Sequence, residues 1–301
     1  MLLFALATTL IWGLAELFYK RGARPDEKWS HLKICVFVGA VMGLHAIVTL
    51  IASGEKYDFS NIIYYLPVSL CYVLSMTLSY FGMRFIEESI SDPIENTSGA
   101  LCTLMCVIFL RETVSPLAAA AIIVTVIGIV GIGWLEGSHG ERKKKLGKKA
   151  AIIAFSMPFC YAILDALGSF LDIIYLDIGR SPLKNVTEEN IETVANVSYE
   201  LTFLIFALVL LAIMLIKGEK IGIRGQGDKL LAAVFETGGQ LTYVYAMSGN
   251  GAIAAPIISS VCVVSLLLSR VFLKEKLTVK QYIFIAAVIL GIILLAVAEG
   301  E

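Results

Sequence analysis

Residues 121–137 read AIIVTVIGIVGIGWLEG, and residues 284–300 read FIAAVILGIILLAVAEG. Both runs are mostly apolar, carry a glycine at the eighth position and end in Glu-Gly. The second run follows the first by 163 residues, and the same offset aligns all of 77–137 with 240–300 without a gap. A repeat at a fixed spacing indicates two related structural units. The matched pairs include Tyr80/Tyr243, Pro93/Pro256, Ile94/Ile257, Phe109/Phe272, Glu112/Glu275, Gly128/Gly291, Glu136/Glu299 and Gly137/Gly300.

The whole chain is as apolar as these two runs. Of its 301 residues, 58% are hydrophobic and 16% are charged, whereas a soluble domain is about half apolar and a quarter charged. A membrane-spanning helix needs about 20 mostly apolar residues, and ten segments meet that requirement. We therefore predict an all-α membrane protein with ten transmembrane helices, at roughly 2–20, 31–53, 61–84, 89–110, 115–135, 149–170, 197–217, 228–248, 251–273 and 279–298.

The loops between these segments differ in charge. Loops 1, 3, 5, 7 and 9 with the adjacent helix ends hold all but four of the 24 Lys and Arg residues, and the exceptions are Lys56, Arg111, Arg180 and Lys184. Positive residues favour the cytoplasmic side. We therefore expect a multi-pass protein of the plasma (inner) membrane with both termini outside. The polar segment from about 171 to 196, which contains Asp172, is predicted to be an outward-facing loop.

The repeat extends more weakly to the start of each half. At an offset of 149, Trp12 corresponds to Tyr161 and Glu16 to Asp165. We place the first repeat at 1–140 and the second at 141–301. Each holds five helices, an odd number, so the second repeat must be inverted relative to the first. Inverted repeats are typical of transporters that work by alternating access.

The first helix carries a Trp-Gly pair, Trp12-Gly13, and three further motifs occur in the same order in both halves. These are Pro93 and Pro256, the pairs Arg111-Glu112 and Lys274-Glu275, and the glycines Gly128 and Gly291. In this arrangement the chain resembles the drug/metabolite transporter (DMT) superfamily, specifically its EamA-like ten-helix members. The resemblance covers essentially the whole chain. It implies a secondary transporter with a central substrate cavity between the halves; relatives move amino acids, nucleotide sugars, sugars, choline or drugs.

Charged residues inside spans need a reason, because each costs about 2.5–3.5 kcal/mol near the bilayer centre. We interpret Glu16 and Asp165 as a related pair that binds a cation or protons; the alternative is that both reach the headgroups. His45, in the middle of helix 2, either relays protons or forms a hydrogen bond between helices. Glu95 and Asn96 can reach the cavity from the start of helix 4, whereas Asp92 suits a helix cap.

A second group of candidates shares one helix face or is aromatic. Glu236, Gln240 and Tyr243 lie at i, i+4 and i+7 of helix 8, which places them on one face, lining the cavity or forming a seam between helices. Aromatic side chains among acids favour ammonium groups through cation–π attraction; the alternative is packing. These aromatic candidates are Trp12, Tyr80, Tyr161 and Tyr243. Tyr199 and Glu200 are expected at the outer start of helix 7, at an entrance or in the interfacial region.

Together these residues predict a secondary active transporter of a small organic metabolite. The excess of acids in the spans favours a cationic or zwitterionic substrate, such as an amino acid, an amine or a quaternary ammonium compound. A sugar or nucleoside permease and a non-transporting receptor or channel subunit are the alternatives. No Walker A motif occurs and the three histidines are far apart, so we expect neither an ATP-driven pump nor an enzyme. We expect no cofactor or metal and no nucleic acid. The expected partners are the bilayer, the substrate and protons as the candidate coupling ion, with the protein a monomer or homodimer.

Overall fold

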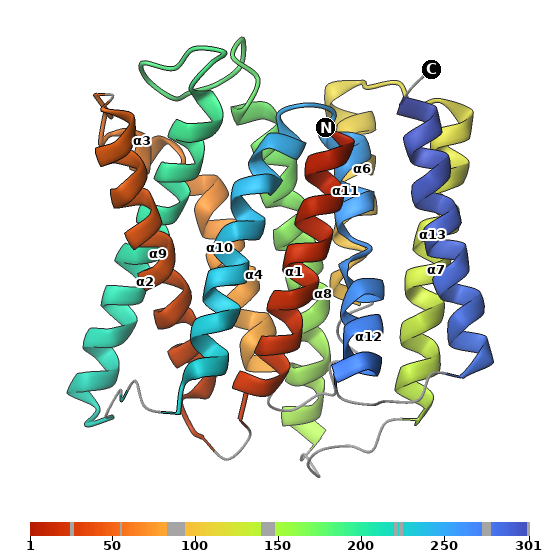
Figure 1. The fold of residues 1–301 in the computed structure, drawn as a ribbon, viewed down its shortest axis with the longest axis horizontal. Helices are drawn as coiled ribbons and strands as arrows, with labels where there is room; N and C mark the ends of the chain where they lie inside the picture. Colours follow the sequence, from red (N-terminus) through yellow and green to blue (C-terminus); the bar gives the residue numbers. More distant parts are fainter. Residues whose placement is uncertain are drawn as a thin grey trace.

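The computed structural model describes residues 1–24, 27–54, 56–82, 94–139, 148–219, 222, 225–272 and 278–299. Within these residues the chain forms helices and connections, and no strand. The helices run side by side between two ends of the molecule, and both termini lie at the same end (Figure 1). We call this the termini end. The helices are α1 Leu2–Gly22, α2 Ser30–Ser53, α3 Asn61–Tyr64, α4 Leu66–Gly82, α6 Ser98–Met105, the π-helix η1 Cys106–Leu110, α7 Pro116–His139, α8 Lys148–Tyr175, α9 Ile191–Ile216, α10 Gly227–Met247, α11 Gly251–Ile258, α12 Val261–Phe272 and α13 Val279–Glu299.

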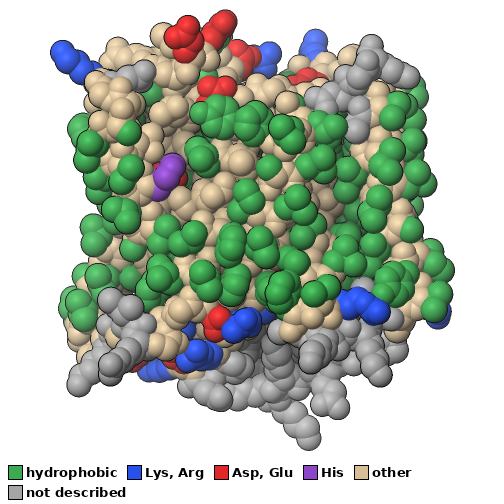
Figure 2. All heavy atoms as spheres, in the orientation of Figure 1, with side chains coloured by type: hydrophobic (Ala, Val, Ile, Leu, Met, Phe, Trp, Pro, Cys, Tyr) green, Lys and Arg blue, Asp and Glu red, His purple; other side chains and the backbone are tan. Residues whose placement is uncertain are grey.

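The outer surface is apolar between the two ends. Figure 2 shows hydrophobic side chains spread over this face, with Lys, Arg, Asp and Glu gathered toward its two rims. Large apolar side chains are freely exposed there, for example Leu3 at 78% and Ile216 at 83%. Among the residues that the structure describes, five stretches are long and apolar enough to cross a bilayer: α1, α2, residues 156–175 of α8, α9, and Gly251–Phe272. A continuous exposed apolar belt of this kind suits lipid as the solvent.

Pairs of helices from the two predicted repeats pack against each other at the sides of the molecule. α2 packs on α9, and α7 packs on α13. In both pairs glycine permits the close approach. A Cβ added at Gly39 of α2 would overlap the Phe203 carbonyl oxygen of α9, and one at Gly128 of α7 would overlap Val288 of α13. The helices α1, α4, α8, α10 and α11 lie between these pairs and enclose the centre.

The span predicted at 251–273 is interrupted. α11 ends at Ile258, residues 259–260 form a turn, and α12 begins at Val261. In the span predicted at 89–110, residues 96–97 form a turn in the same way and α6 begins at Ser98. The two turns differ in position by 163 residues, which is the offset of the repeat. Both broken helices therefore follow one structural plan, although the sequence pattern predicted continuous helices.

Pro256 explains part of this interruption. Proline has no N–H to donate to the carbonyl four residues earlier, which is that of Ala252. The hydroxyl of Thr103 on α6 donates to that carbonyl instead, at 2.7 Å. The backbone N–H of Gly99 in turn donates to Ser259 Oγ at 3.0 Å. The two broken helices thus satisfy each other's backbone groups, as non-helical backbone inside a membrane requires.

Two predicted boundaries are wrong. α8 continues to Tyr175, so Asp172 lies inside this helix and is fully buried, not in an outward-facing loop. α9 begins at Ile191, so Tyr199 and Glu200 lie two turns inside it and are buried. In both cases hydroxyl or imidazole groups of neighbouring helices hydrogen-bond the carboxylate, which lets a charged residue continue a spanning helix. Asp92, Pro93, Lys274, Glu275 and most of the basic stretch after 140 lie outside the described residues.

Candidate substrate cavity

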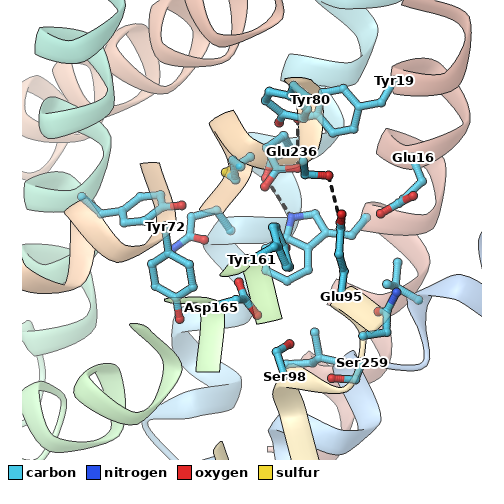
Figure 3. Close-up of a pocket in the computed structure, with 18 residues that line it drawn as sticks. Glu16, Tyr19, Tyr72, Tyr80, Glu95, Ser98, Tyr161, Asp165, Glu236 and Ser259 are labelled. Atoms are coloured by element: carbon cyan, nitrogen blue, oxygen red, sulfur yellow. Dashed lines mark hydrogen bonds between the residues drawn. The ribbon is translucent and has the colours of Figure 1, made fainter. Parts of the chain in front are cut away.

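The main cavity lies at the centre of the molecule, where α1, α4, α8, α9 and α10 meet the two helix breaks (Figure 3). It holds about 820 Å³ of space free of atoms, including the solvent at its mouth. Concave sites lined by aromatic groups and a few polar groups are typical ligand-binding sites. Its walls are formed by Trp12, Glu16, Tyr19, Tyr72, Met76, Ser79, Tyr80, Glu95, Asn96, Ser98, Tyr161, Asp165, Tyr199, Glu236, Gln240, Ile258, Ser259 and Val261.

Four of these side chains are carboxylates, and each comes from a different element. Glu16 lies on α1, Asp165 on α8 and Glu236 on α10, while Glu95 directly precedes the turn before α6. Glu95 and Glu236 each interact electrostatically with both Glu16 and Asp165. No Lys, Arg or His of the described residues lines the cavity. The cavity therefore concentrates acidic groups, with no basic side chain of the described residues among them.

Neutral donors hold three of the four carboxylates. Ser79 donates to Glu95 Oε2 at 2.8 Å, and Tyr19 donates to Glu236 Oε2 at 3.1 Å. Asp165 accepts hydrogen bonds from Ser98 and Tyr161. These hydroxyl groups orient the carboxylates without neutralising them.

Aromatic rings complete the walls. Trp12 donates from Nε1 to the carbonyl of Glu236 at 3.2 Å, and its ring packs on Tyr243 with centroids 5.2 Å apart. Gly239 makes room for this indole, because a Cβ there would overlap the ring. Tyr19 and Tyr80 pack together with centroids 4.8 Å apart. A site of this kind can hold a cation against aromatic faces as well as against carboxylates.

A buried hydrogen-bond network lies between the cavity and the termini end. Asp172 is seven residues beyond Asp165 on α8, about 10 Å along the helix axis toward that end. It accepts hydrogen bonds from Tyr65 and, at 3.1 Å, from Tyr72. The hydroxyl of Tyr72 also lies 2.5 Å from that of Tyr243. This network, Tyr65, Tyr72, Asp172 and Tyr243, joins α4, α8 and α10 and we call it the tyrosine gate.

The opposite end of the molecule carries an ionic cluster. Lys33 on α2 pairs with Glu27 at 2.6 Å and with Glu219 at 2.7 Å, and Lys229 on α10 pairs with Glu27 at 2.9 Å. Burial of Glu27 tends to raise its pKa, but the hydrogen bonds and charges of Lys33 and Lys229 outweigh that effect and the pKa is lowered. Glu27 therefore connects the loop after α1 to the starts of α2 and α10.

The residues at the two helix breaks and at the two ends are related by the repeat. Glu95, Asn96 and Ser98 correspond to Ile258, Ser259 and Val261 at the offset of 163, and all six line the cavity. Tyr243 belongs to the tyrosine gate, whereas its counterpart Tyr80 lies against Tyr19 and Glu236, on the side of the cavity away from the termini. Related residues at opposite ends are what an inverted repeat produces.

The structure brings most of the predicted site residues together. Nine line the main cavity: Trp12, Glu16, Tyr80, Glu95, Asn96, Tyr161, Asp165, Glu236 and Gln240. Tyr243 lines a smaller cavity that shares Trp12, Tyr72 and Asp165 with the main one. His45 lies elsewhere, on α2, with Nδ1 2.8 and 2.9 Å from the two carboxylate oxygens of Glu200 on α9.

Tyr19 and Tyr72 line the cavity although the sequence analysis did not single them out, and Tyr199 lies deeper in its helix than predicted. The signal for Tyr19 was present, because Trp12, Glu16 and Tyr19 lie at i, i+4 and i+7 on one face of α1. Tyr72 lies eight residues before Tyr80 on α4 in the same way. Tyr199 was misplaced together with the start of its helix. Ser79 and Ser98 carry no pattern of their own, since their role depends on which carboxylate the fold places beside them.

The comparisons with known proteins agree with this architecture. The model of the EamA-like transporter family matches residues 1–134 and 186–297. Among the solved structures, 28 chains match. One of them, titled "Crystal structure of protein", matches with a TM-score of 0.71 and 14% sequence identity, and the match covers 98% of this chain and 96% of that chain. At 14% sequence identity, this similarity shows a shared fold and nothing more. No curated protein matches.

Taken together, the exposed apolar belt, the broken helices and the central cavity define a helical membrane transporter. The chain belongs to the EamA-like transporter family, a ten-helix membrane fold of the drug/metabolite transporter superfamily. The predicted fold class and family are thus confirmed.

Proposed function

We propose that the protein is a secondary active transporter that moves a small organic cation or zwitterion by alternating access. Amines, amino acids and quaternary ammonium compounds form this class. The observation that carries the proposal is the set of four carboxylates in an aromatic cavity that no described Lys, Arg or His lines. A bound ammonium group would offset their charge, whereas a neutral sugar would leave the buried charges uncompensated.

The coupling ion we propose is the proton. Glu16 and Asp165 occupy related positions in the two repeats, so each can carry a proton when its side of the cavity is open. The tyrosine gate and the ionic cluster lie on opposite sides of the cavity, as two alternating closures would. From the distribution of Lys and Arg we propose that the termini end faces outside.

Uptake into proteoliposomes tests the proposal. We expect labelled organic cations to accumulate when a proton gradient is imposed, and to exchange in counterflow without one. Glu16→Gln and Asp165→Asn should reduce gradient-driven uptake at least tenfold, because each removes one titratable carboxylate from the cavity. Glu189→Gln, on an exposed loop, is the matched control and should transport as the wild type does.

The same experiment separates other classes of function. Saturating counterflow contradicts a channel. If uptake and its pH dependence are unchanged in both Glu16→Gln and Asp165→Asn, the coupling roles are wrong. If sugars or nucleosides exchange and cations do not, the substrate class is wrong.

A further inference from the structure

We propose that the transported molecule carries two or more ammonium groups, as a linear aliphatic diamine or polyamine does. The inference rests on the transport function proposed above and narrows its substrate class. Figure 3 shows the residues that carry it: Glu16, Glu95, Asp165 and Glu236 around one cavity.

The balance of charge in the cavity favours a ligand with more than one positive charge. Four carboxylates share the cavity, and the side chains of Glu95 and Glu236 are only 8% and 7% exposed. Buried like charges repel strongly when little water screens them. Each carboxylate needs a proton or a cation. A molecule with one ammonium group would offset a single charge, whereas a diamine or triamine offsets two or three.

Two carboxylates outside the cavity, the buried Glu200 and the partly exposed Glu27, show a contrast. Glu200, fully buried, is paired with His45, and Glu27 is paired with Lys33 and Lys229. The protein thus supplies cations to these two carboxylates, whereas the buried Asp172 is held by tyrosine hydroxyls. In the cavity, Glu95, Asp165 and Glu236 likewise receive serine and tyrosine hydroxyls, and no described Lys, Arg or His lines the cavity beside them. The positive charge for these three carboxylates is left to the ligand.

The carboxylates are also spread over the cavity. Glu16, Glu95 and Glu236 gather toward one part of it in Figure 3, and Asp165 lies on the other side of Tyr161. Tyr161 and Trp12 also line the cavity, where they can contact an alkyl chain. Two ammonium groups at the ends of such a chain match two separated anionic positions better than one compact charge does.

Gln240 adds an independent polar feature. This residue is 2% exposed and lines the cavity, and among the described residues its Nε2 has no hydrogen-bond partner. Buried amides normally have partners, so a ligand is the natural one. A 180° rotation of the amide group exchanges Nε2 and Oε1. The oxygen can then accept a hydrogen bond from an ammonium group or from the N–H of a secondary amine. Among the described residues no group of three or more His, Cys, Asp or Glu is arranged to hold a metal ion, which favours an organic cation.

Equilibrium binding to the purified full-length protein tests the inference with amines of equal carbon chain. We expect 1,4-diaminobutane to bind at least tenfold more tightly than 1-aminobutane, and spermidine at least as tightly as 1,4-diaminobutane. Glu16→Gln and Asp165→Asn should each remove most of the preference for the diamine while changing the affinity for 1-aminobutane less than threefold. Glu189→Gln should retain the preference. Titration calorimetry and thermal shift give the affinities.

The outcomes distinguish this inference from the broader proposal. Equal affinity for 1-aminobutane and 1,4-diaminobutane would overturn the inference, and counterflow of a monoamine or amino acid would then leave the transport function standing. If none of the cations binds or exchanges, both fail. A diamine preference that survives in the Glu16→Gln/Asp165→Asn double variant would place the second ammonium group outside this cavity and refute the assignment of these carboxylates.

Discussion

At the scale of single residues, the pair His45 and Glu200 shows how the fold retains a charge away from the cavity. The Glu200 side chain is fully buried, and the His45 side chain is 33% exposed. Removing one partner of a buried pair leaves the other without compensation and costs about 3–5 kcal/mol. Both residues join α2 to α9. Removing one member of the pair should therefore destabilise the protein more than replacing both members with apolar residues.

We predict that His45→Leu lowers the melting temperature of the purified protein markedly, because the Glu200 carboxylate loses its only hydrogen-bond partner among the described side chains. The double variant His45→Leu/Glu200→Leu should recover most of that loss, since no buried charge remains. Melting followed by circular dichroism measures both. If the double variant is less stable than His45→Leu, the pair stabilises through something other than charge compensation.

Glu27 gives a pH dependence whose sign is fixed by its partners. Its pKa is lowered from the ordinary value of 4.5 in the folded state, so it stabilises the protein above that value. The contribution is lost as the pH falls through the lowered pKa. We predict that the wild type is more stable than Glu27→Gln at pH 7, by about 1 kcal/mol because the group is partly solvated. The difference should shrink below about pH 4.5. A constant difference from pH 7 to pH 3 would contradict the ionic role of Glu27.

At the scale of helices, glycine decides how closely α1 and α10 approach. A Cβ at Gly239 would overlap the Trp12 ring, whereas one at the adjacent Gly238 would lie 3.6 Å from Ile11 Cγ2, an ordinary contact. We predict that Gly239→Ala displaces Trp12 from the cavity wall and weakens cation binding about tenfold. Gly238→Ala should leave binding unchanged, and replacing glycine within a helix adds up to about 1 kcal/mol of helix preference. Thermal-shift titration measures binding, and equal affinities in the two variants would contradict the role of Gly239.

The hydrogen bond from Thr103 beside the helix interruption at Pro256 can be tested by mutation. Thr103 donates to the Ala252 carbonyl that Pro256 leaves without a partner. Thr103→Val therefore leaves a buried carbonyl unsatisfied, at a cost of about 1–3 kcal/mol. In a Pro256→Ala background the restored N–H can serve Ala252, so Thr103→Val should cost less there. A double-mutant cycle on unfolding free energies measures the coupling. A coupling near zero would show that Thr103 acts independently of Pro256.

At the scale of the whole molecule, the sequence predicts what is periodic and misses what depends on distant neighbours. The spans and the repeat follow from apolar runs and from pairs such as Tyr80/Tyr243. The turns at 96–97 and 259–260 could not be predicted, because the apolar run resumes directly after Ser259 and Ser260 and a single proline does not reveal whether a helix bends or ends. Asp172 looked like a loop residue because its charge is visible in the sequence, whereas Tyr65 and Tyr72 reach it only through the fold.

The two closures make alternating access testable in the whole molecule. Tyr65 and Tyr72 donate to Asp172, and Tyr72 also contacts Tyr243, so the tyrosine gate links both halves on the termini side of the cavity. Asp172→Ala removes the carboxylate that accepts hydrogen bonds from both Tyr65 and Tyr72, and so weakens the connection of α8 to these two tyrosines. The equilibrium should then shift toward the state open at the termini end. On the opposite side, Glu27→Ala should favour the other state, because Lys33 and Lys229 lose the carboxylate that joins them.

We predict opposite changes in access to one position. With Gln240→Cys as the single reactive cysteine, an impermeant maleimide added from the termini side should label it at least threefold faster in Asp172→Ala and more slowly in Glu27→Ala. Adding the reagent from the other side should reverse the order. Because both variants carry the same reporter and each lacks one carboxylate, a general loosening of the fold would speed labelling from both sides in both variants. That result would contradict gating, whereas the reciprocal pattern follows only if the tyrosine gate and the ionic cluster close the cavity in alternation.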